Sequence, residues 1–430
     1  MRFLGIGDTC DLGALYMRLL ADGHAVKVHV ADPLAQGTMA GLVEHTPNWE
    51  NELAWVGTDG IILFENVAQA RGELQDRLRR DGFQVVGGSA FGDRLENDRA
   101  FAQRILAEHG LQTAEVTEFS DLASAEDFLD RHPGRYVLKF NGTNFSSNEN
   151  YVGRLSDGAD VRAVLRAKFF ERQGETFSFV LMEHIEGVEM GVGAYFNGER
   201  FIGKACLDWE HKRFFPGNMG ELTGEMGTIA TFDRSRKFFE RTLLPMTPML
   251  AANGYCGYIN LNTIVNARGI WPLEFTCRFG YPGFAVLSPL QGTKWGDLFR
   301  AMVTRQGNAT MLPGFAAAVV LTTPPFPYER DTVENAVGLP VMFDGELGDQ
   351  QQNQLYYGEV GIANGQLVTS GIYGWTMVAT AVADNIDEAR RKAGELADKV
   401  IVPNVRYRRD IGTGLIEGDF AFVENLGLLD

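Results

Sequence analysis

The chain has 430 residues, which is too long for one ordinary hydrophobic core, so we expect about two to four domains. Hydrophobic residues account for 45% and charged residues for 22% of the chain, as in globular rather than disordered proteins. The 56 acidic residues outnumber the 39 lysines and arginines, and the formal net charge is −17. An acidic surface repels nucleic acids and anionic membranes, so neither is expected as a partner.

Cysteine usage and the lack of long apolar segments predict a cytoplasmic protein. The chain contains four widely spaced cysteines with no CxxC pair: Cys10, Cys206, Cys256 and Cys277. This spacing argues against a zinc site or a disulfide framework and suits a reducing compartment. The chain starts with only a short apolar run before Asp8, so no signal peptide is expected. No window holds about 18 consecutive apolar residues, so no transmembrane helix is expected.

Strands alternate with helices in the N-terminal part of the chain. Strands are expected at residues 2–6, 25–30, 60–64 and 83–86. Helices are expected at residues 12–20 and 67–80, and Gly23 ends the first of them. This alternation predicts a small parallel α/β layer.

The central part of the chain predicts a mixed α+β module. Helices are expected at residues 95–109, ended by Gly110, and at 123–131, and strands at 112–119, 136–140, 179–184 and 191–196. Further on, residues 255–265 and 270–275 predict a hairpin around the turn 266–269.

The last part of the chain follows a Pro-rich connection at residues 322–327. It predicts a second hairpin, with strands at 359–362 and 367–370, then a strand at 376–383 and a helix at 386–400.

Two strand ends carry residues suited to a magnesium nucleotide. In residues 273–280 (Leu-Glu-Phe-Thr-Cys-Arg-Phe-Gly), Glu274 can ligate Mg²⁺ and Arg278 can bind a carboxylate or phosphate. In residues 180–189 (Val-Leu-Met-Glu-His-Ile-Glu-Gly-Val-Glu), the strand end can offer backbone groups to adenine, and a later carboxylate can accept both ribose hydroxyls. The alternative for both stretches is an ordinary strand with charged surface residues.

Basic residues gather at two further places in this acidic chain. His211, Lys212 and Arg213 are consecutive, and residues 223–228 (Thr-Gly-Glu-Met-Gly-Thr) follow them. Lys139 closes an apolar strand, where it can reach a nucleotide phosphate. The alternative at both places is a solvated charged surface.

Together, these stretches resemble the phosphoribosylamine–glycine ligase family, a branch of the ATP-grasp ligases, in order and spacing across nearly the whole chain. The most specific matches are His-Lys-Arg with the later Gly-Glu-Met-Gly, the stretch at 273–280, and Tyr-Arg-Arg-Asp-Ile-Gly at 407–412. The resemblance implies a multidomain α/β and α+β fold. Its parts would be an N-terminal Rossmann-like (pre-ATP-grasp) domain at 1–94, an ATP-grasp domain at 95–310 with a lid subdomain at about 115–190, and a small β-rich C-terminal domain at 311–430.

The resemblance also implies an enzyme, an ATP-dependent C–N ligase that in this family serves purine biosynthesis. ATP phosphorylates a carboxylate to an acyl phosphate, and an amine then displaces phosphate. The implied cofactors are ATP and Mg²⁺ (or Mn²⁺), and the implied partners are a small-molecule amine and a small-molecule carboxylate. A monomer or homodimer is expected.

The site residues carried over by position fall into three groups. The ATP-binding group is Arg99 and Lys139 at the phosphates, Glu183, His184 and Ile185 at adenine, and Glu189 at the ribose. The metal-binding group is Glu274 and Thr276. The catalytic group is His211, Lys212, Arg213 and Arg278, of which the last would hold the carboxylate of the acyl donor.

The chain departs from the family pattern on the substrate side. The family has a Gly-Gly-Arg-Glu-His type loop for phosphoribosylamine, whereas residues 7–13 lack the arginine and carry two aspartates that would repel a phosphate. The polar stretch 140–148 replaces a glycine-rich lid loop. Thr276 replaces an asparagine that usually joins Glu274 at the metal, and Asn260 and Asn262 on the neighbouring strand could help. Tyr-Pro-Gly at 281–283 replaces Asp-Pro-Glu.

These departures leave three functions open. The chain is a phosphoribosylamine–glycine ligase with unusual loops, a related ligase for another amine or acid in a specialised or modified-nucleoside pathway, or a non-catalytic nucleotide-binding descendant. Lys139, Glu189, Glu274 and Arg278 are all present, which argues against the third.

Overall fold

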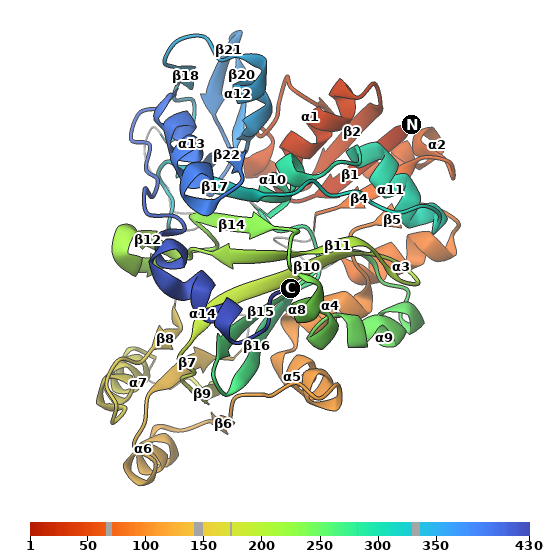
Figure 1. Ribbon diagram of the computed structural model, residues 1–430. Helices are drawn as coiled ribbons and strands as arrows, with labels where there is room; N and C mark the ends of the chain where they lie inside the picture. Colours follow the sequence, from red (N-terminus) through yellow and green to blue (C-terminus); the bar gives the residue numbers. More distant parts are fainter. Residues whose placement is uncertain (66–70, 142–148, 173, 282, 329–335) are drawn as a thin grey trace.

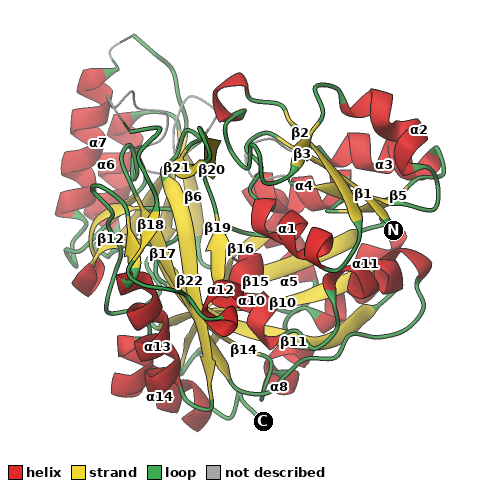
Figure 2. Cartoon of the chain, turned by 90° about the horizontal axis from the view of Figure 1, so that it is seen from above, coloured by secondary structure: helices red, strands yellow, loops and turns green. Residues whose placement is uncertain are grey.

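The computed structural model describes the whole chain except residues 66–70, 142–148, 173, 282 and 329–335. The N-terminal part forms a five-stranded parallel sheet in the order β3-β2-β1-β4-β5. Its strands are β1 (Arg2–Gly7), β2 (Ala25–Val30), β3 (Glu44–His45), β4 (Ile61–Phe64) and β5 (Gln84–Val86). Helix α1 (Gly13–Ala21) covers one face, and α2 (Leu53–Val56) and α3 (Gly72–Arg80) cover the other (Figure 2). The predicted parallel α/β layer is confirmed.

The predicted helix at 95–109 is wrong as one element, because the chain breaks there into α4 (Ala90–Asn97) and α5 (Arg99–Glu108). Asp98 causes the break, since its side chain accepts a hydrogen bond from the Phe101 amide at 2.9 Å and so caps α5. Arg99 therefore stands in the first turn of a helix. The helix predicted at 67–80 is described from Gly72 onward, and residues 67–70 of that prediction lie outside the described part.

A small lid projects from the body at the lower end of Figure 1. Its four-stranded antiparallel sheet has the order β6-β9-β7-β8, with β6 (Val116–Phe119), β7 (Tyr136–Phe140), β8 (Tyr151–Val152) and β9 (Phe179–Glu183). Helices α6 (Leu122–Arg131) and α7 (Ala159–Glu171) pack on it through an apolar cluster that includes Leu129, Leu165 and Phe179. This cluster is separate from the apolar cores of the body, so the lid has a small hydrophobic core of its own.

The body is built on an eight-stranded antiparallel sheet in the order β16-β15-β10-β11-β14-β17-β22-β19. The strands are β10 (Val188–Asn197), β11 (Phe201–Glu210), β14 (Gly227–Thr231), β15 (Cys256–Asn266), β16 (Gly269–Thr276), β17 (Phe315–Thr322), β19 (Leu355–Tyr357) and β22 (Trp375–Ala383). The boundary expected at 310/311 falls inside this sheet, because its last three strands come from the C-terminal part. The boundary expected at 94/95 falls inside α4.

Helices fill the space between the two large sheets. α1, α10 (Gly283–Leu287) and α11 (Trp295–Thr304) share one apolar cluster with β1 and with strands of the eight-stranded sheet. The opposite face of the large sheet packs against α5, α8 (Arg236–Arg241), α9 (Thr247–Ala252), α13 (Ile386–Asp398) and α14 (Phe420–Asn425). The remaining elements are α12 (Asp349–Gln354) and the short strands β12 (Arg213–Phe215), β13 (Met219–Leu222), β18 (Met342–Phe343), β20 (Val360–Ala363), β21 (Gln366–Thr369) and β23 (Val400–Ile401).

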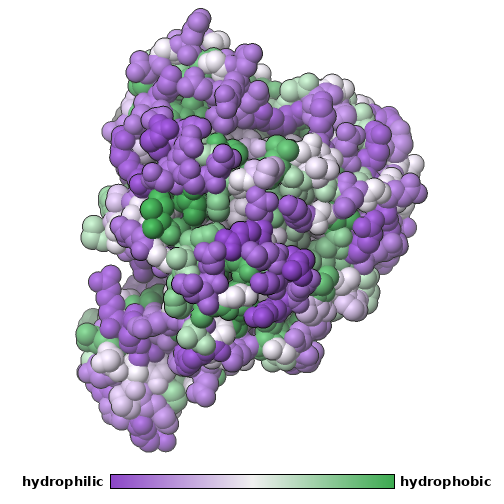
Figure 3. All heavy atoms as spheres, in the orientation of Figure 1, coloured by the Kyte–Doolittle hydropathy of each residue, from purple (hydrophilic) through white to green (hydrophobic). Residues whose placement is uncertain are grey.

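The surface is largely hydrophilic on the face drawn in Figure 3, and an indentation separates the lid from the body there. Within the described residues, we find no helix that combines the length and the apolar character needed to cross a bilayer.

A buried arginine fastens the C-terminal segment to the body. Arg408 is 1% exposed and forms two hydrogen bonds with the Asp410 carboxylate, at 2.8 Å and 2.6 Å. Its Nη1 also donates to the Arg213 carbonyl at 2.9 Å and to the Asn218 side chain at 3.1 Å. The segment 407–412 is therefore held against β12, which starts at the basic run.

We predict that Arg408→Met lowers the free energy of unfolding by about 3 kcal/mol, because it leaves Asp410 without its buried partner. Chemical denaturation of the purified variant measures this change. Arg409→Met is the matched control, since Arg409 is 68% exposed in its pair with Asp398 and its loss should cost less than about 1 kcal/mol. Equal destabilisation by the two substitutions would contradict the assignment.

Candidate active site

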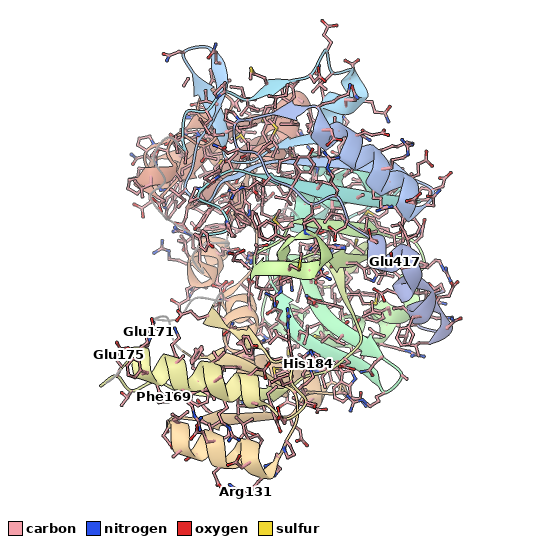
Figure 4. All side chains as sticks on the ribbon, turned by 90° about the vertical axis from the view of Figure 1, so that its left-hand side faces the viewer. Arg131, Phe169, Glu171, Glu175, His184 and Glu417 are labelled. Atoms are coloured by element: carbon pink, nitrogen blue, oxygen red, sulfur yellow. The ribbon has the colours of Figure 1, made fainter. Side chains whose placement is uncertain are left out.

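A cavity of about 550 Å³, the outer cavity, lies between the lid and the body. All six residues predicted to bind ATP line it: Arg99, Lys139, Glu183, His184, Ile185 and Glu189. Lys212, Arg213, Glu274 and Arg278 line it as well. Figure 4 shows His184 between the lid helices and the strands of the body. The fold thus brings together residues that are far apart in the sequence.

One end of the outer cavity is apolar. Ile185 is 4% exposed and packs with Met182 and Ala114, and Val137 and Trp271 lie against this cluster. His184 follows β9 directly, and its Nε2 lies 3.2 Å from Arg135 Nη2. Such a flat apolar wall with nearby backbone groups can hold an aromatic base.

The other end of the outer cavity carries cationic side chains. Lys139 is the last but one residue of the lid strand β7, and it has no ion-pair partner among the residues that the structure describes. Burial, together with the neighbouring positive charges of Arg99 and Lys212, lowers the pKa of Lys139 to about 8. Arg99 Nη2 lies 3.9 Å from Glu274 Oε2. These cations are poised to hold an anion such as a phosphate.

Lys212 connects three carboxylates at the centre of the site. Its Nζ lies 3.0 Å from Glu189 Oε1, 3.3 Å from Glu210 Oε2 and 3.4 Å from Glu274 Oε1. Burial alone would lower the pKa of Lys212, but the three carboxylates raise it well above its usual value. Asn262 adds a hydrogen bond of 2.8 Å from Nδ2 to Glu189 Oε1. Lys212 therefore stays charged and fixes the carboxylates around it.

Glu274 and Thr276 present one face of β16 to the site, since residues two apart on a strand point the same way. Lys212 and, against the effect of burial, Lys139 and Arg99 lower the pKa of Glu274 to about 2. Its side chain keeps 45% exposure to the cleft. The described residues contain no cluster of three or more His, Cys, Asp or Glu side chains able to hold a metal. The carboxylate of Glu274 and the hydroxyl of Thr276 would suit a Mg²⁺ ion whose other ligands are phosphate and water oxygens.

Two of the predicted catalytic residues have other partners. Arg278 Nη2 lies 3.0 Å from Glu96 Oε1, so that guanidinium group already has a carboxylate. His211 is not among the residues that line the outer cavity or the inner cavity described next, and its predicted catalytic role stays a prediction. Its Nε2 accepts a hydrogen bond from the Gly412 amide at 3.0 Å, and burial and the charge of Arg408 lower its pKa to about 4. His211 thus joins the body to the C-terminal segment.

A second cavity of about 200 Å³, the inner cavity, adjoins the first. Lys212, Gly224, Glu274, Arg278 and Trp375 line both cavities, which therefore meet at the predicted metal ligand. The other lining residues are mainly polar or aromatic: Asp208, Glu210, Glu225, Thr228, Tyr258, Asn260, Thr276 and Tyr281. Asn260 lies opposite Thr276 in the sheet and donates to Asp208 Oδ2 at 2.6 Å. Sequence reasoning did not assign Asp208 or Glu225, although both flank the basic run and are acidic residues within otherwise apolar or glycine-rich stretches.

Comparison with known proteins shows which proteins the chain is similar to. Residues 97–284 match the model described as phosphoribosylglycinamide synthetase, ATP-grasp (A) domain. The chain is 27% identical over 399 residues to a phosphoribosylamine–glycine ligase of Chlorobaculum tepidum, an alignment covering 87% of this chain and 90% of the relative. It is 25% identical to the ligase of Listeria innocua, over 96% of this chain and 99% of the relative.

The chain is therefore similar to phosphoribosylamine–glycine ligases over most of its length, and its central part matches the ATP-grasp domain of that family. Its fold is similar to that of phosphoribosylamine–glycine ligase from Thermotoga maritima, with a TM-score of 0.71 at 22% identity over 96% of this chain and 100% of that one. The predicted resemblance to this ligase family and the predicted multidomain architecture are therefore confirmed. The roles assigned to single residues and the domain boundaries stay predictions.

The loop after β1 departs from the family in a definite way. Glu65 is buried, and its carboxylate accepts hydrogen bonds from the Asp11 amide at 2.9 Å and from the Tyr16 hydroxyl at 2.7 Å. A Cβ atom at Gly7 would come within 2.1 Å of Glu65 Oε2, so only glycine leaves room for this carboxylate. Asp8 is also buried, and its Oδ1 lies 2.5 Å from Arg71 Nη2. The backbone amides of Asp11 and Leu12, which could face a ligand phosphate, thus donate to the carboxylate of Glu65 instead.

At the other departure from the family pattern, Tyr281 takes the place of one carboxylate and Gly283 that of the second. Tyr281 stacks on Trp375 with ring centroids 5.0 Å apart, and both line the inner cavity. The loop that carries Trp375 wraps Glu359, which accepts hydrogen bonds from the backbone amides of Ile372, Tyr373 and Gly374. Pro282 of the predicted Tyr-Pro-Gly segment lies outside the described residues.

The lowered pKa of Lys139 generates a pH prediction. A bound phosphate stabilises the charged lysine, so nucleotide binding should take up a proton near pH 8, and affinity for ADP should fall as the pH rises from about 7 to about 9.5. Calorimetry of ADP binding in buffers of different ionisation enthalpy measures the proton uptake. The Lys139→Met variant should lose it, and proton uptake that persists in the variant would contradict this origin.

Proposed function

We propose that the protein is an ATP-dependent carboxylate–amine ligase that works through an acyl phosphate. The observation that carries the proposal is the outer cavity, which combines an apolar end, the cations Lys139 and Arg99, and the carboxylate of Glu274. A nucleotide needs these three environments in this order, because its base is apolar and its phosphates are anionic and bind metal. A cytoplasmic enzyme acting as a monomer or homodimer is part of the same proposal.

In this proposal, Ile185 and its neighbours bind adenine and Glu189 binds the ribose. Lys139 and Arg99 neutralise charge on the terminal phosphates. Glu274 and Thr276 hold Mg²⁺, which when bound would neutralise the phosphoryl group during transfer. The lid carries Lys139, so its closure over the body excludes water from the reacting groups.

In this proposal, Lys212 positions the carboxylates of Glu189, Glu210 and Glu274. Without a cation between them, Glu189, Glu210 and Glu274 would repel one another and Glu274 would hold its proton more tightly. With Lys212 in place, Glu274 stays ionised and ready to bind metal.

The amine substrate is the part of the proposal that differs from the named activity of the relatives. The curated relatives carry the name phosphoribosylamine–glycine ligase, and similarity over most of the chain favours that pair of substrates as a second candidate. Against it, the loop after β1 holds Asp8 and Asp11 where that family binds a phosphorylated amine, and Glu65, which follows β4, is buried against this loop. Burial and the charge of Asp11 raise the pKa of Glu65 to about 8, and burial raises that of Asp11 to about 6. A phosphate dianion would meet carboxyl groups there, so we propose an amine that lacks a phosphate.

We predict that Glu274→Ala lowers ATP-dependent phosphate release by at least about 10²-fold with its fold intact, because the site loses its metal carboxylate. Coupled ADP and phosphate assays across panels of amino acids and amines provide the measurement. The exposed Glu417→Gln variant should release phosphate like the wild type. Undiminished release by Glu274→Ala would exclude Glu274 as the metal ligand.

We also predict little product when the protein is given ATP, Mg²⁺, glycine and freshly made phosphoribosylamine, with glycinamide ribonucleotide measured by mass spectrometry. Rapid formation of that product would show that the acidic loop does not exclude a phosphate and would favour the second candidate.

A further inference from the structure

The inner cavity contains buried hydrogen-bonding atoms that the protein leaves unused. Asp208 and Glu225 are each 6% exposed, and Asp208 Oδ1 and Glu225 Oε1 are buried without a hydrogen-bond partner among the described residues. Thr228 Oγ1 and the Tyr281 hydroxyl are unpartnered in the same way. All four residues line this cavity. Buried polar atoms are nearly always satisfied, so four around one space indicate that a ligand completes them.

The ligand implied by these atoms is a hydrogen-bond donor with positive charge. Both carboxyl groups can only accept when ionised, and the two cations of the cavity have other partners. Lys212 is shared by Glu189, Glu210 and Glu274, and Arg278 is paired with Glu96. The carboxyl groups of Asp208 and Glu225 therefore have no cation of their own.

Two glycines of strand β10 leave room for the side chains of Asp208 and Tyr258. A Cβ atom at Gly191 would lie 2.1 Å from Asp208 Oδ1, and one at Gly193 would lie 1.9 Å from the Tyr258 hydroxyl. Two glycines on one strand thus leave space for an aspartate and a tyrosine that both face the inner cavity. Asn260 fixes the other oxygen of Asp208 at 2.6 Å, which orients the unpartnered oxygen.

An ammonium group suits this site better than a metal ion. Among the described residues, no group of three or more potential metal ligands has a suitable arrangement. An ammonium group carries three donors and one charge, and two carboxylates with a hydroxyl match that pattern. We propose that the inner cavity binds the amine substrate of the ligase as a small primary ammonium ion held by Asp208 and Glu225. This inference rests on the proposed ligase function and names the class of its amine.

The same carboxyl groups suit the proton transfer that the reaction requires. An ammonium ion must give up one proton before its nitrogen can attack, and Asp208 or Glu225 receives it. The neutral amine then forms the C–N bond with the acyl carbon, the acyl C–O bond breaks, and phosphate leaves with the second nitrogen proton. Burial and the charge of Glu210 raise the pKa of Asp208 to about 8, which makes it a base of suitable strength near neutral pH.

The two cavities are arranged for this sequence of events. They meet at Glu274 and Lys212, so an amine in the inner cavity lies next to the end of the outer cavity that would hold the phosphates. The inner cavity of about 200 Å³ is below the usual size range of sites for larger ligands, which favours a compact amine.

Ligand-observed NMR titration of the full-length protein at saturating ADP and millimolar Mg²⁺ tests the inference. The probes are ethanolamine, its neutral analogue ethylene glycol, and O-phosphoethanolamine, which keeps the ammonium group and carries a phosphate ester on the hydroxyl oxygen. We expect ethanolamine to bind at least about tenfold more tightly than either other probe. Asp208→Asn and Glu225→Gln should each weaken ethanolamine binding by about tenfold or more, and Glu417→Gln should leave it unchanged.

Near-isosteric substitutions keep the volume of the cavity, and thermal unfolding of each variant verifies the fold. Equal binding of ethanolamine and ethylene glycol, or unchanged ethanolamine binding in both Asp208→Asn and Glu225→Gln, would overturn the inference. Tighter binding of O-phosphoethanolamine would overturn it as well. ADP binding is recorded first in the same sample, and its absence would refute the ligase proposal itself rather than the choice of amine.

Discussion

The ion-pair cluster around Lys212 is the interaction on which the site depends. One ammonium group lies within 3.4 Å of carboxylates from β10, β11 and β16, three different strands of the large sheet. In an acidic chain, three carboxylates this close would otherwise lose their charge through mutual repulsion and burial. Lys212 lowers the pKa of Glu274 and lies at the point where the outer and inner cavities meet.

The two cavities differ in charge, so they suit ligands of opposite charge. The outer cavity gathers Arg99 and Lys139 with an apolar wall, which suits an anion attached to an aromatic base. The inner cavity holds Asp208, Glu210 and Glu225, and its cations already have carboxylate partners. A protein of net charge −17 thus concentrates positive charge where a nucleotide needs it and leaves the rest acidic.

Much of this arrangement could be predicted from sequence, for identifiable reasons. Local patterns gave the strand 136–140 and the hairpin of β15 and β16 nearly to the residue, because alternating apolar residues and a turn fix such elements. The resemblance in motif order identified six candidates for ATP binding, and all six line the outer cavity. The break at Asp98 was missed, since a capping aspartate inside a helical pattern gives only a weak signal.

Other features depend on contacts between distant parts of the chain and could not be predicted locally. His211 looks basic and catalytic in its run, but its acceptor bond with Gly412 is a tertiary contact across 201 positions. The partnership of Arg278 with Glu96 is of the same kind. Asp208 appears as an ordinary strand residue, and its importance emerges only from the lack of a partner for one oxygen and from the glycine opposite it.

The central claim is that magnesium and nucleotide share the space between Lys139 and Glu274. The most direct measurement is the calorimetric affinity for ADP with and without Mg²⁺, in the wild type and in Glu274→Gln. The account predicts that Mg²⁺ strengthens ADP binding by about tenfold or more in the wild type and has little effect in the variant. Failure of the wild type to bind ADP, or an equal effect of Mg²⁺ in both proteins, would contradict it.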